Sequence, residues 1–340
     1  MWSFVKNLFM KILNMSKFLQ FEDVLQALRS EGKCSGQVKP DEYHAMKPQL
    51  EEALGVPVIS KSTLSEFSRG SYRFKWNLDN NIRQTSAALA LGSLVDTLTL
   101  TPELFPQLYS VEEPRVQLKK DGSPYSDGRQ DPAQKEEWQA KAEMGISVIS
   151  PADQQKGSDI AAVATATMLS HGLAVGETCE TQVGMWVYID NLHGEPLARP
   201  LVVTGMLDIL PTRNTDLLWD LKTTSEDICN ASRISLNAET FHYGMQAALY
   251  SDLWRICSGE EHAREFGFLF VGTKEPYMAR ALFMGADVLE LYREEYSQLM
   301  SEYAVASKLN YWGEAEQEPI HFAPSSYEYR RIGRRAGTNA

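Results

Sequence analysis

Thr204-Gly-Met-Leu-Asp-Ile-Leu210 and Leu217-Leu-Trp-Asp-Leu-Lys222 are two apolar stretches that each carry a single aspartate. Both are predicted to be β-strands, and side chains two residues apart on a strand share a face. Asp220 and Lys222 are therefore expected on one face, and a hairpin between the strands would bring Asp208 beside them. An unpaired carboxylate is costly to bury in an apolar strand, so metal ligation would explain both aspartates. The alternative is a surface salt bridge at a sheet edge.

These three side chains match what phosphodiester cleavage requires. The reaction needs hard oxygen ligands that hold Mg²⁺ and a cation near the attacking water and the scissile phosphate. Two carboxylates and one ammonium group would supply both. The sequence thus predicts a metal-dependent centre with Asp208, Asp220 and Lys222 as its catalytic residues.

The overall charge limits what the protein can bind. The chain of 340 residues has 45 acidic and 33 basic side chains, and its formal net charge is −12. A protein that coats nucleic acid over its whole surface needs clustered lysine and arginine, which replace the phosphate counterions. That class is excluded, whereas a local basic channel within an acidic exterior is not.

Three parts are expected along the chain. Residues 1–55 are predicted to be a helical appendage. Residues 56–325 are predicted to be an α/β nuclease domain that contains this centre, and residues 326–340 a basic tail. The apolar residues of the first helix recur at helical spacing: Trp2, Val5, Leu8, Phe9 and Ile12. This stripe could pack on the protein's own core or a sister subunit, or touch a membrane or partner. No apolar run is long enough to span a bilayer.

The core is expected to be a small mixed sheet flanked by helices. Alternating apolar residues predict strands, and runs with helical periodicity predict helices. The predicted strands are 180–190, 199–210, 217–222, 265–272 and 277–283, and the predicted helices are 85–100, 153–170, 240–257 and 287–309. Residues 30–36 are expected to be a polar linker and residues 114–134 an exposed loop.

Several motifs occur in an order that resembles a known family. They are Ile59-Ser-Lys-Ser-Thr-Leu-Ser-Glu-Phe67, Leu91-Gly-Ser-Leu-Val-Asp-Thr-Leu98, Gly205-Met-Leu-Asp208, Trp219-Asp-Leu-Lys-Thr-Thr224, Tyr243-Gly-Met-Gln-Ala-Ala-Leu-Tyr250 and Phe268-Leu-Phe-Val-Gly-Thr-Lys-Glu-Pro-Tyr277. The ordered set resembles the PD-(D/E)XK nucleases, and more closely the RecE-type exonucleases and their phage relatives. The resemblance covers roughly residues 57–325 and implies a restriction-endonuclease-like α/β core.

The resemblance also implies a set of metal ligands. Asp208 and Asp220 would bind the metal with the Leu221 carbonyl, and Lys222 would position the water or help to deprotonate it. Glu180 resembles the additional acidic residue of these nucleases, although an alternating strand also carries exposed glutamates. Asp96 stands where RecE-type enzymes usually have a metal-binding histidine. An aspartate can ligate Mg²⁺ through oxygen, or it can mark a weakened enzyme.

A helix after the catalytic strand is implied to hold DNA. Gln246 and Tyr250 lie four residues apart and Tyr243 one turn earlier, so the three can share one helical face. In the family this helix lies beside the metal site and helps to bind DNA. The alternative is an ordinary amphipathic helix whose polar positions face solvent.

The activity implied by the resemblance is metal-dependent exonucleolytic degradation of duplex DNA from its ends, with Mg²⁺ as the metal and Mn²⁺ as a substitute. A homo-oligomer, a single-strand annealing protein as partner and a role in phage-type recombination are also implied. Two alternatives stay open. One is a structure-specific or endonucleolytic enzyme of the same fold, and the other is a catalytically weak protein that binds DNA ends or a partner.

No other cofactor is expected. The cysteines are far apart and none follows Cys257, which excludes the ligand spacing of an iron–sulfur cluster or a disulfide framework. No G-x-x-x-x-G-K-[ST] loop is present, so no nucleotide is expected. Lys6 and Lys11 interrupt the first apolar run and no signal cleavage site follows, which favours a cytoplasmic protein without a membrane partner.

Overall fold

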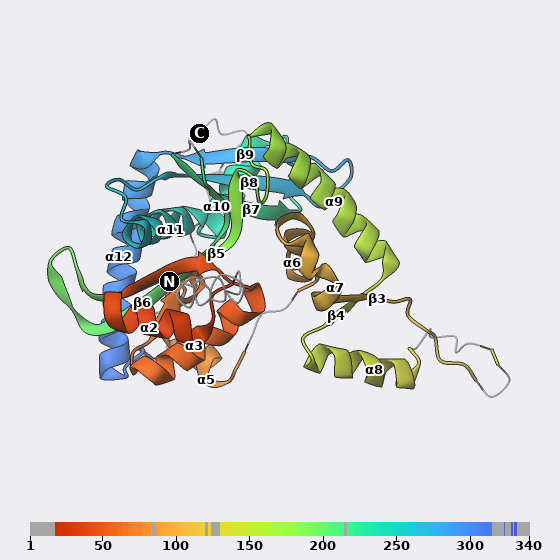
Figure 1. Ribbon diagram of the computed structural model, residues 1–340, viewed down its shortest axis with the longest axis horizontal. Coiled ribbons are helices and arrows are strands. Elements are labelled where there is room, and N and C mark those ends of the chain that lie inside the picture. The colour runs from red at the N-terminus through yellow and green to blue at the C-terminus, as the bar shows by residue number, and fades with distance from the viewer. Residues whose placement is uncertain are drawn as a thin grey trace, which may run out of the picture.

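The computed structural model describes residues 18–82, 86–119, 122–123, 130–213 and 216–314, and residues 323, 328, 330 and 331. A central sheet with helices on both faces forms the body, and an arm projects from it (Figure 1). The helices are α2 (Phe21–Glu31), α3 (Pro40–Leu54), α4 (Lys61–Phe67), α5 (Ser71–Asp79), α6 (Ala87–Leu100), η1 (Pro102–Leu104), α7 (Phe105–Leu108), α8 (Pro132–Glu143), α9 (Pro151–Ser170), α10 (Ala231–Thr240), α11 (Tyr243–Ser258) and α12 (Ala286–Leu309). The strands are β1 (Lys33–Gln37), β2 (Val58–Ser60), β3 (Tyr109–Val111), β4 (Ser147–Ile149), β5 (Cys179–Leu192), β6 (Glu195–Pro211), β7 (Leu217–Thr224), β8 (Glu265–Gly272) and β9 (Ala279–Met284).

The main sheet is mixed. Its strand order is β1-β5-β6-β7-β8-β9, and β2 pairs with β6 outside this path. The β7–β8 and β2–β6 pairs are parallel, and the other neighbouring pairs are antiparallel. The prediction of an α/β core with a mixed sheet flanked by helices is therefore confirmed.

Helices cover both faces of this sheet. On one face, α11 and α12 pack over buried side chains that include Leu218 and Phe268. On the other face, α6 and α9 pack over a second cluster that includes Trp219 and Leu269. Successive residues of a strand face opposite ways, so β7 and β8 contribute to both clusters. A strand buried on both faces needs apolar residues at nearly every position, as Phe266-Gly-Phe-Leu-Phe-Val271 shows.

The N-terminal segment is part of the main sheet. The linker prediction for residues 30–36 is wrong, because Lys33–Gln37 forms β1 and pairs antiparallel with Val183–Val187 of β5. Val24 of α2 and Leu50 of α3 are buried in one apolar cluster with Trp186 of β5. Residues 21–54 thus add a strand and an apolar layer to the body, which a purely helical appendage would not do.

An arm extends from the body over residues 105–150 (Figure 1). Strands β3 and β4 form a separate parallel pair, and α8 begins inside the span predicted as a loop. Among the described residues of this span, Gln134 alone is buried. Polar contacts replace a core: Glu112 accepts a hydrogen bond from Trp138 Nε1 at 2.7 Å and pairs with Lys141.

Two predicted segments cannot be compared with the structure. The N-terminal amphipathic helix lies outside the described residues, as does most of the basic tail of residues 326–340. Within the part that is described, no helix is both long enough and apolar enough to cross a membrane.

Candidate active site

Strands β6 and β7 pair over a short stretch and then diverge. Among the described residues, the aligned pair is Ile209 of β6 with Trp219 of β7. Beside this pair, the Leu221 N–H donates a hydrogen bond to Asp208 Oδ2 at 3.0 Å. A carboxylate thus takes the place of a backbone carbonyl as the acceptor of this ladder N–H. The interaction fixes the Asp208 side chain against β7, where it is 9% exposed.

Asp220 lies on β7 with a relative exposure of 1%. Gln246 Nε2 of α11 donates to its Oδ1 at 2.7 Å, and the Lys222 ammonium forms an ion pair with its Oδ2. The predicted proximity of Asp220 and Lys222 is therefore present in the structure. Asp208 joins them across the gap between the two strands, close enough for its charge to act on both.

These charges shift one another's protonation. Burial raises the pKa of Asp208 well above its usual range, and the Asp220 and Asp96 carboxylates raise it further. Burial opposes the charge on Lys222, but Asp220 and Asp208 outweigh it and raise the pKa of the ammonium above its ordinary value. Lys222 is therefore protonated at neutral pH.

Asp96 approaches the same centre from α6. The helix packs tightly on β7 because Gly92 has no side chain, and a Cβ there would lie 3.2 Å from Thr223 Oγ1. Asp96 follows four residues later, on the same side of the helix. Burial raises the pKa of Asp96 to about 7, with Lys222 opposing the shift and Asp220 adding to it. The structure thus brings Asp96 within reach of both charges.

Gln182, and not the predicted Glu180, lies at the charged centre. Glu180 is exposed, and no described contact joins it to Asp208 or Asp220. Gln182 is 4% exposed and donates from Nε2 to Asp208 Oδ1 at 3.4 Å. Its backbone has a φ of 55°, in the left-handed region that non-glycine residues rarely adopt. Sequence reasoning missed Gln182, because strand periodicity carries no signal for a local change of backbone conformation.

The predicted DNA-binding helix is α11, and its three residues have different surroundings. Gln246 is buried on Asp220, as described above. The Tyr243 ring is stacked on Phe268 at 5.3 Å, and Lys222 Nζ lies 5.2 Å from its centroid. The Tyr250 ring packs against Gly205 of β6, which has no side chain. A Cβ at Gly205 would lie 2.6 Å from Tyr250 Cε1. Tyr243 and Gln246 contact the charged centre directly. Burial raises the pKa of the Tyr250 hydroxyl, and Asp220 and Asp208 lie near enough to add to this shift.

Among the described residues, the buried Gln182 Oε1 accepts no hydrogen bond, and Asp220 Oδ2 is bound by the Lys222 ammonium alone. Unsatisfied buried oxygens are costly, and hard cations such as Mg²⁺ bind oxygen ligands. Among the residues that the structure describes, no three aspartate, glutamate, histidine or cysteine side chains are arranged to hold a metal ion by themselves. The donor set fits Mg²⁺ nonetheless, because Mg²⁺ binds through one or two carboxylates and keeps several waters.

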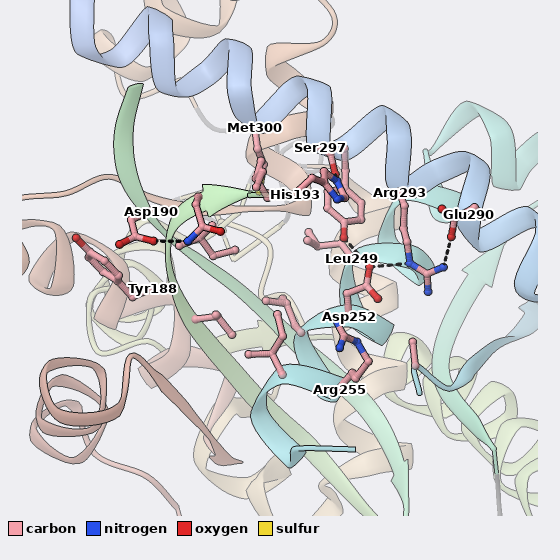
Figure 2. Close-up of a pocket in the computed structure, with 18 of the residues that line it drawn as sticks. Tyr188, Asp190, His193, Leu249, Asp252, Arg255, Glu290, Arg293, Ser297 and Met300 are labelled. Carbon is pink, nitrogen blue, oxygen red and sulfur yellow. Dashed lines mark hydrogen bonds and ion pairs between the residues drawn. The ribbon is translucent and has the colours of Figure 1, made fainter. Parts of the chain in front are cut away.

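A separate cavity of about 620 Å³ lies among β5, α11 and α12 (Figure 2). Asp252 stands at its wall and accepts hydrogen bonds from Arg293 Nε at 2.8 Å and the Tyr296 hydroxyl at 2.6 Å. The α11 residues that line it run from Leu249 to Ile256, beyond Gln246. Since none of its lining residues belongs to the predicted site, this cavity is distinct from the charged centre.

The fold agrees with that of one solved protein. A provisionally named exonuclease from Eubacterium rectale superposes with a TM-score of 0.50 and 14% identity, over 87% of this chain and 99% of that chain. The two chains share this fold. A phage-related exonuclease from Haemophilus somnus 129PT matches less well, with a TM-score of 0.28 and 16% identity, over 57% of this chain and 91% of that chain. No protein-family model and no curated protein matches the sequence.

The likeness to the Eubacterium rectale protein concerns the backbone. At 14% identity it says nothing about which side chains act in either protein. The charged centre is defined by its own geometry: two buried carboxylates on neighbouring strands, a lysine bound to one of them, and the buried Gln182 Oε1, which accepts no hydrogen bond from the described residues.

Proposed function

We propose that the protein is a metal-dependent deoxyribonuclease of the PD-(D/E)XK kind that degrades duplex DNA from its ends. The observation that supports this best is the buried pair of Asp208 and Asp220 with the Lys222 ammonium on one carboxylate. Two carboxylates buried side by side repel each other, and one lysine neutralises only part of their charge. A divalent cation would offset the remainder.

Asp208 and Asp220 would hold Mg²⁺, with the Leu221 carbonyl and Asp96 as further oxygen ligands, and Mn²⁺ would substitute. Bound Mg²⁺ would supply a Lewis acid and a more acidic water molecule. The Leu221 N–H and Gln246 fix the orientation of the two carboxylates through the hydrogen bonds described above. This preorganisation avoids rearrangement of the ligands during the reaction.

Lys222 would position the attacking water and balance the charge of the scissile phosphate. Its ion pair with Asp220 would hold the ammonium in place for this role. In the hydrolysis the water loses a proton to solvent and its oxygen bonds to phosphorus, the bond from phosphorus to one nucleotide oxygen breaks, and that leaving oxygen takes up a proton from solvent. Gln246 and Tyr243 would line the strand being cleaved.

We further propose that cleavage starts at the ends of the DNA. This is supported by the fold shared with the protein from Eubacterium rectale, which is named as an exonuclease. A structure-specific or endonucleolytic enzyme of the same fold is the alternative. Linear duplex and covalently closed circular DNA separate the two, because an exonuclease cleaves the linear substrate alone.

The proposal is tested with end-labelled duplex DNA in Mg²⁺, Mn²⁺ or EDTA. Cleavage should require the metal and fall at least about 100-fold in Asp220→Asn and Lys222→Met, the range seen when one preorganised polar group is removed from an active site. Asp252→Asn is the matched control, since Asp252 is also a buried carboxylate bound by a cation but lies at the other cavity. Wild-type cleavage by a folded Asp220→Asn variant, or cleavage that persists in EDTA, would refute the proposal.

A further inference from the structure

Two ammonium groups lie close to the ring of Tyr243. Lys222 Nζ is 5.2 Å from the ring centroid and Lys61 Nζ is 5.3 Å from it. Lys61 is the first residue of α4, which follows β2 directly. Because β2 pairs in parallel with β6 and aligns Ser60 with Thr204, α4 begins beside the strand that carries Asp208. The topology thus places a second lysine at the charged centre.

Lys61 has no acidic partner among the described residues. Its Nζ donates to the Phe241 carbonyl at 2.5 Å, and Arg69, just after α4, donates to the Thr240 carbonyl at 3.5 Å. The other cations of the chain have partners of both kinds: Arg293 pairs with Asp252, whereas Lys33 and Arg199 also bond carbonyl or hydroxyl oxygens. Lys61 differs from these because its Nζ lies over the same ring as Lys222. Two cations that have only carbonyl partners in a chain of net charge −12 retain charge that can bind an anion.

The electrostatics of this group point the same way. Burial and Lys222 lower the pKa of Lys61 to about 7, with Asp220 opposing the shift. Burial, Lys61 and Arg69 lower the pKa of His242, which begins α11. Positive charges therefore act on one another here with too little negative charge between them. An anion bound among them would relieve this repulsion.

A purely structural role for Lys61 is the alternative. Thr240 and Phe241 lie at the end of α10, and cations stabilise the free carbonyls at a helix C-terminus. Lys61 and Arg69 would then serve to hold α4 against α10. This role explains their carbonyl contacts, but it gives no reason for Lys61 to lie over the same ring as Lys222.

We propose that Lys61, supported by Arg69, binds a phosphate of the DNA strand next to the scissile phosphate. The inference deepens the proposed function and rests on it. Lys61 is a positioning residue, because it holds the strand in register while Lys222 acts at the reacting phosphate. The phosphate bound can be an internal phosphodiester or the phosphate at a 5′ end, since both present the same anionic oxygens.

The experiment measures binding without cleavage. Full-length wild type, Lys61→Met, Lys61→Arg and Lys47→Met are titrated with blunt duplexes that carry either a 5′-phosphate or a 5′-hydroxyl, in EDTA and over a range of salt. Lys47 is the matched control: it is a partly buried lysine that bonds Thr63 of the same helix α4, but its charged neighbours are Glu51 and Glu66. Thermal unfolding of each variant is measured in parallel.

Lys61→Met is expected to weaken binding about tenfold and to reduce the slope of log K against log salt by roughly 0.9, the value for one phosphate contact. Lys61→Arg should keep most of the affinity, and Lys47→Met should bind like the wild type. A loss confined to the 5′-phosphorylated duplex identifies the terminal phosphate, and an equal loss on both duplexes identifies an internal one. Wild-type binding by Lys61→Met, with or without a lower melting temperature, would overturn the inference alone. Failure of the wild type to bind either duplex would refute the proposed function and this inference with it.

Discussion

Replacing Asp96 by asparagine is expected to stabilise the metal-free protein at pH 8 more than at pH 5. The ordinary pKa of the carboxyl is 3.8 and its pKa in the folded protein is raised to about 7. A carboxyl with a raised pKa stabilises the folded state while it is protonated, and this contribution is lost as the pH rises from 3.8 through about 7. Asparagine has a similar shape and stays neutral at every pH, so the variant does not lose this contribution to stability.

The magnitude follows from the same two values. At 1.36 kcal/mol for each pH unit between them, the charged Asp96 costs at most ~4 kcal/mol at pH 8. Solvent reaches part of this side chain and reduces the cost, so Asp96→Asn should raise the free energy of unfolding by about 2 kcal/mol. Most of the change should develop between pH 5 and pH 8.

Urea unfolding in EDTA, followed by tryptophan fluorescence, measures this difference at both pH values. Glu103→Gln is the control, because Glu103 is an exposed carboxylate one turn beyond α6. Added Mg²⁺ should then stabilise the wild type more than Asp96→Asn, because a ligand stabilises the state that binds it. An equal gain in stability at pH 5 and pH 8, or no gain at pH 8, would show that the pKa of Asp96 is not raised in the folded protein.

Three further outcomes are expected. Gln182→Ala should reduce cleavage about tenfold by loosening Asp208, whereas Glu180→Gln should leave the rate unchanged; the opposite ranking in a steady-state assay would restore Glu180 as the acidic ligand. Removal of residues 1–55 should cost at least ~5 kcal/mol by exposing Trp186 and its neighbours, and a truncated chain with a wild-type melting curve would contradict this. Asp96→His should shift relative cleavage from Mg²⁺ towards Mn²⁺, because imidazole is a softer ligand, and superimposable metal titrations would remove Asp96 from the site.

Strand β7 could be predicted from the sequence because its pattern is strong. Apolar residues surround Asp208 and Asp220, and period-two alternation correctly places Lys222 on the same side as Asp220. The mixed sheet followed from the same kind of signal, since β8 reads as a short continuous apolar run. In both cases the local sequence and the tertiary environment favour the same structure.

The elements that sequence reasoning missed lack such a signal. β1 is an edge strand of Lys33-Cys-Ser-Gly-Gln37, which needs a neighbour on one side and carries little apolar character. Helix α8 has no apolar stripe because the arm has almost no core. Glu180 was assigned by resemblance alone, and Gln182 had no signal because its left-handed φ breaks the strand alternation on which the prediction depends. Lys61 could not be linked to the site either, because its nearness to Lys222 depends on the pairing of β2 with β6.

The pairing of β7 with β8 has a consequence for how the protein is made. Leu217 aligns with Glu265 and Thr224 with Gly272, whereas the preceding strand offers β7 little backbone pairing. A growing chain on the ribosome therefore cannot fix the Asp220 strand until residue 272 has left the exit tunnel, and the long sequence separation makes this step slow. Gln246, which orients Asp220, also lies in the late part of the chain. Incomplete chains released during synthesis would therefore carry both aspartates without the ordered charged centre.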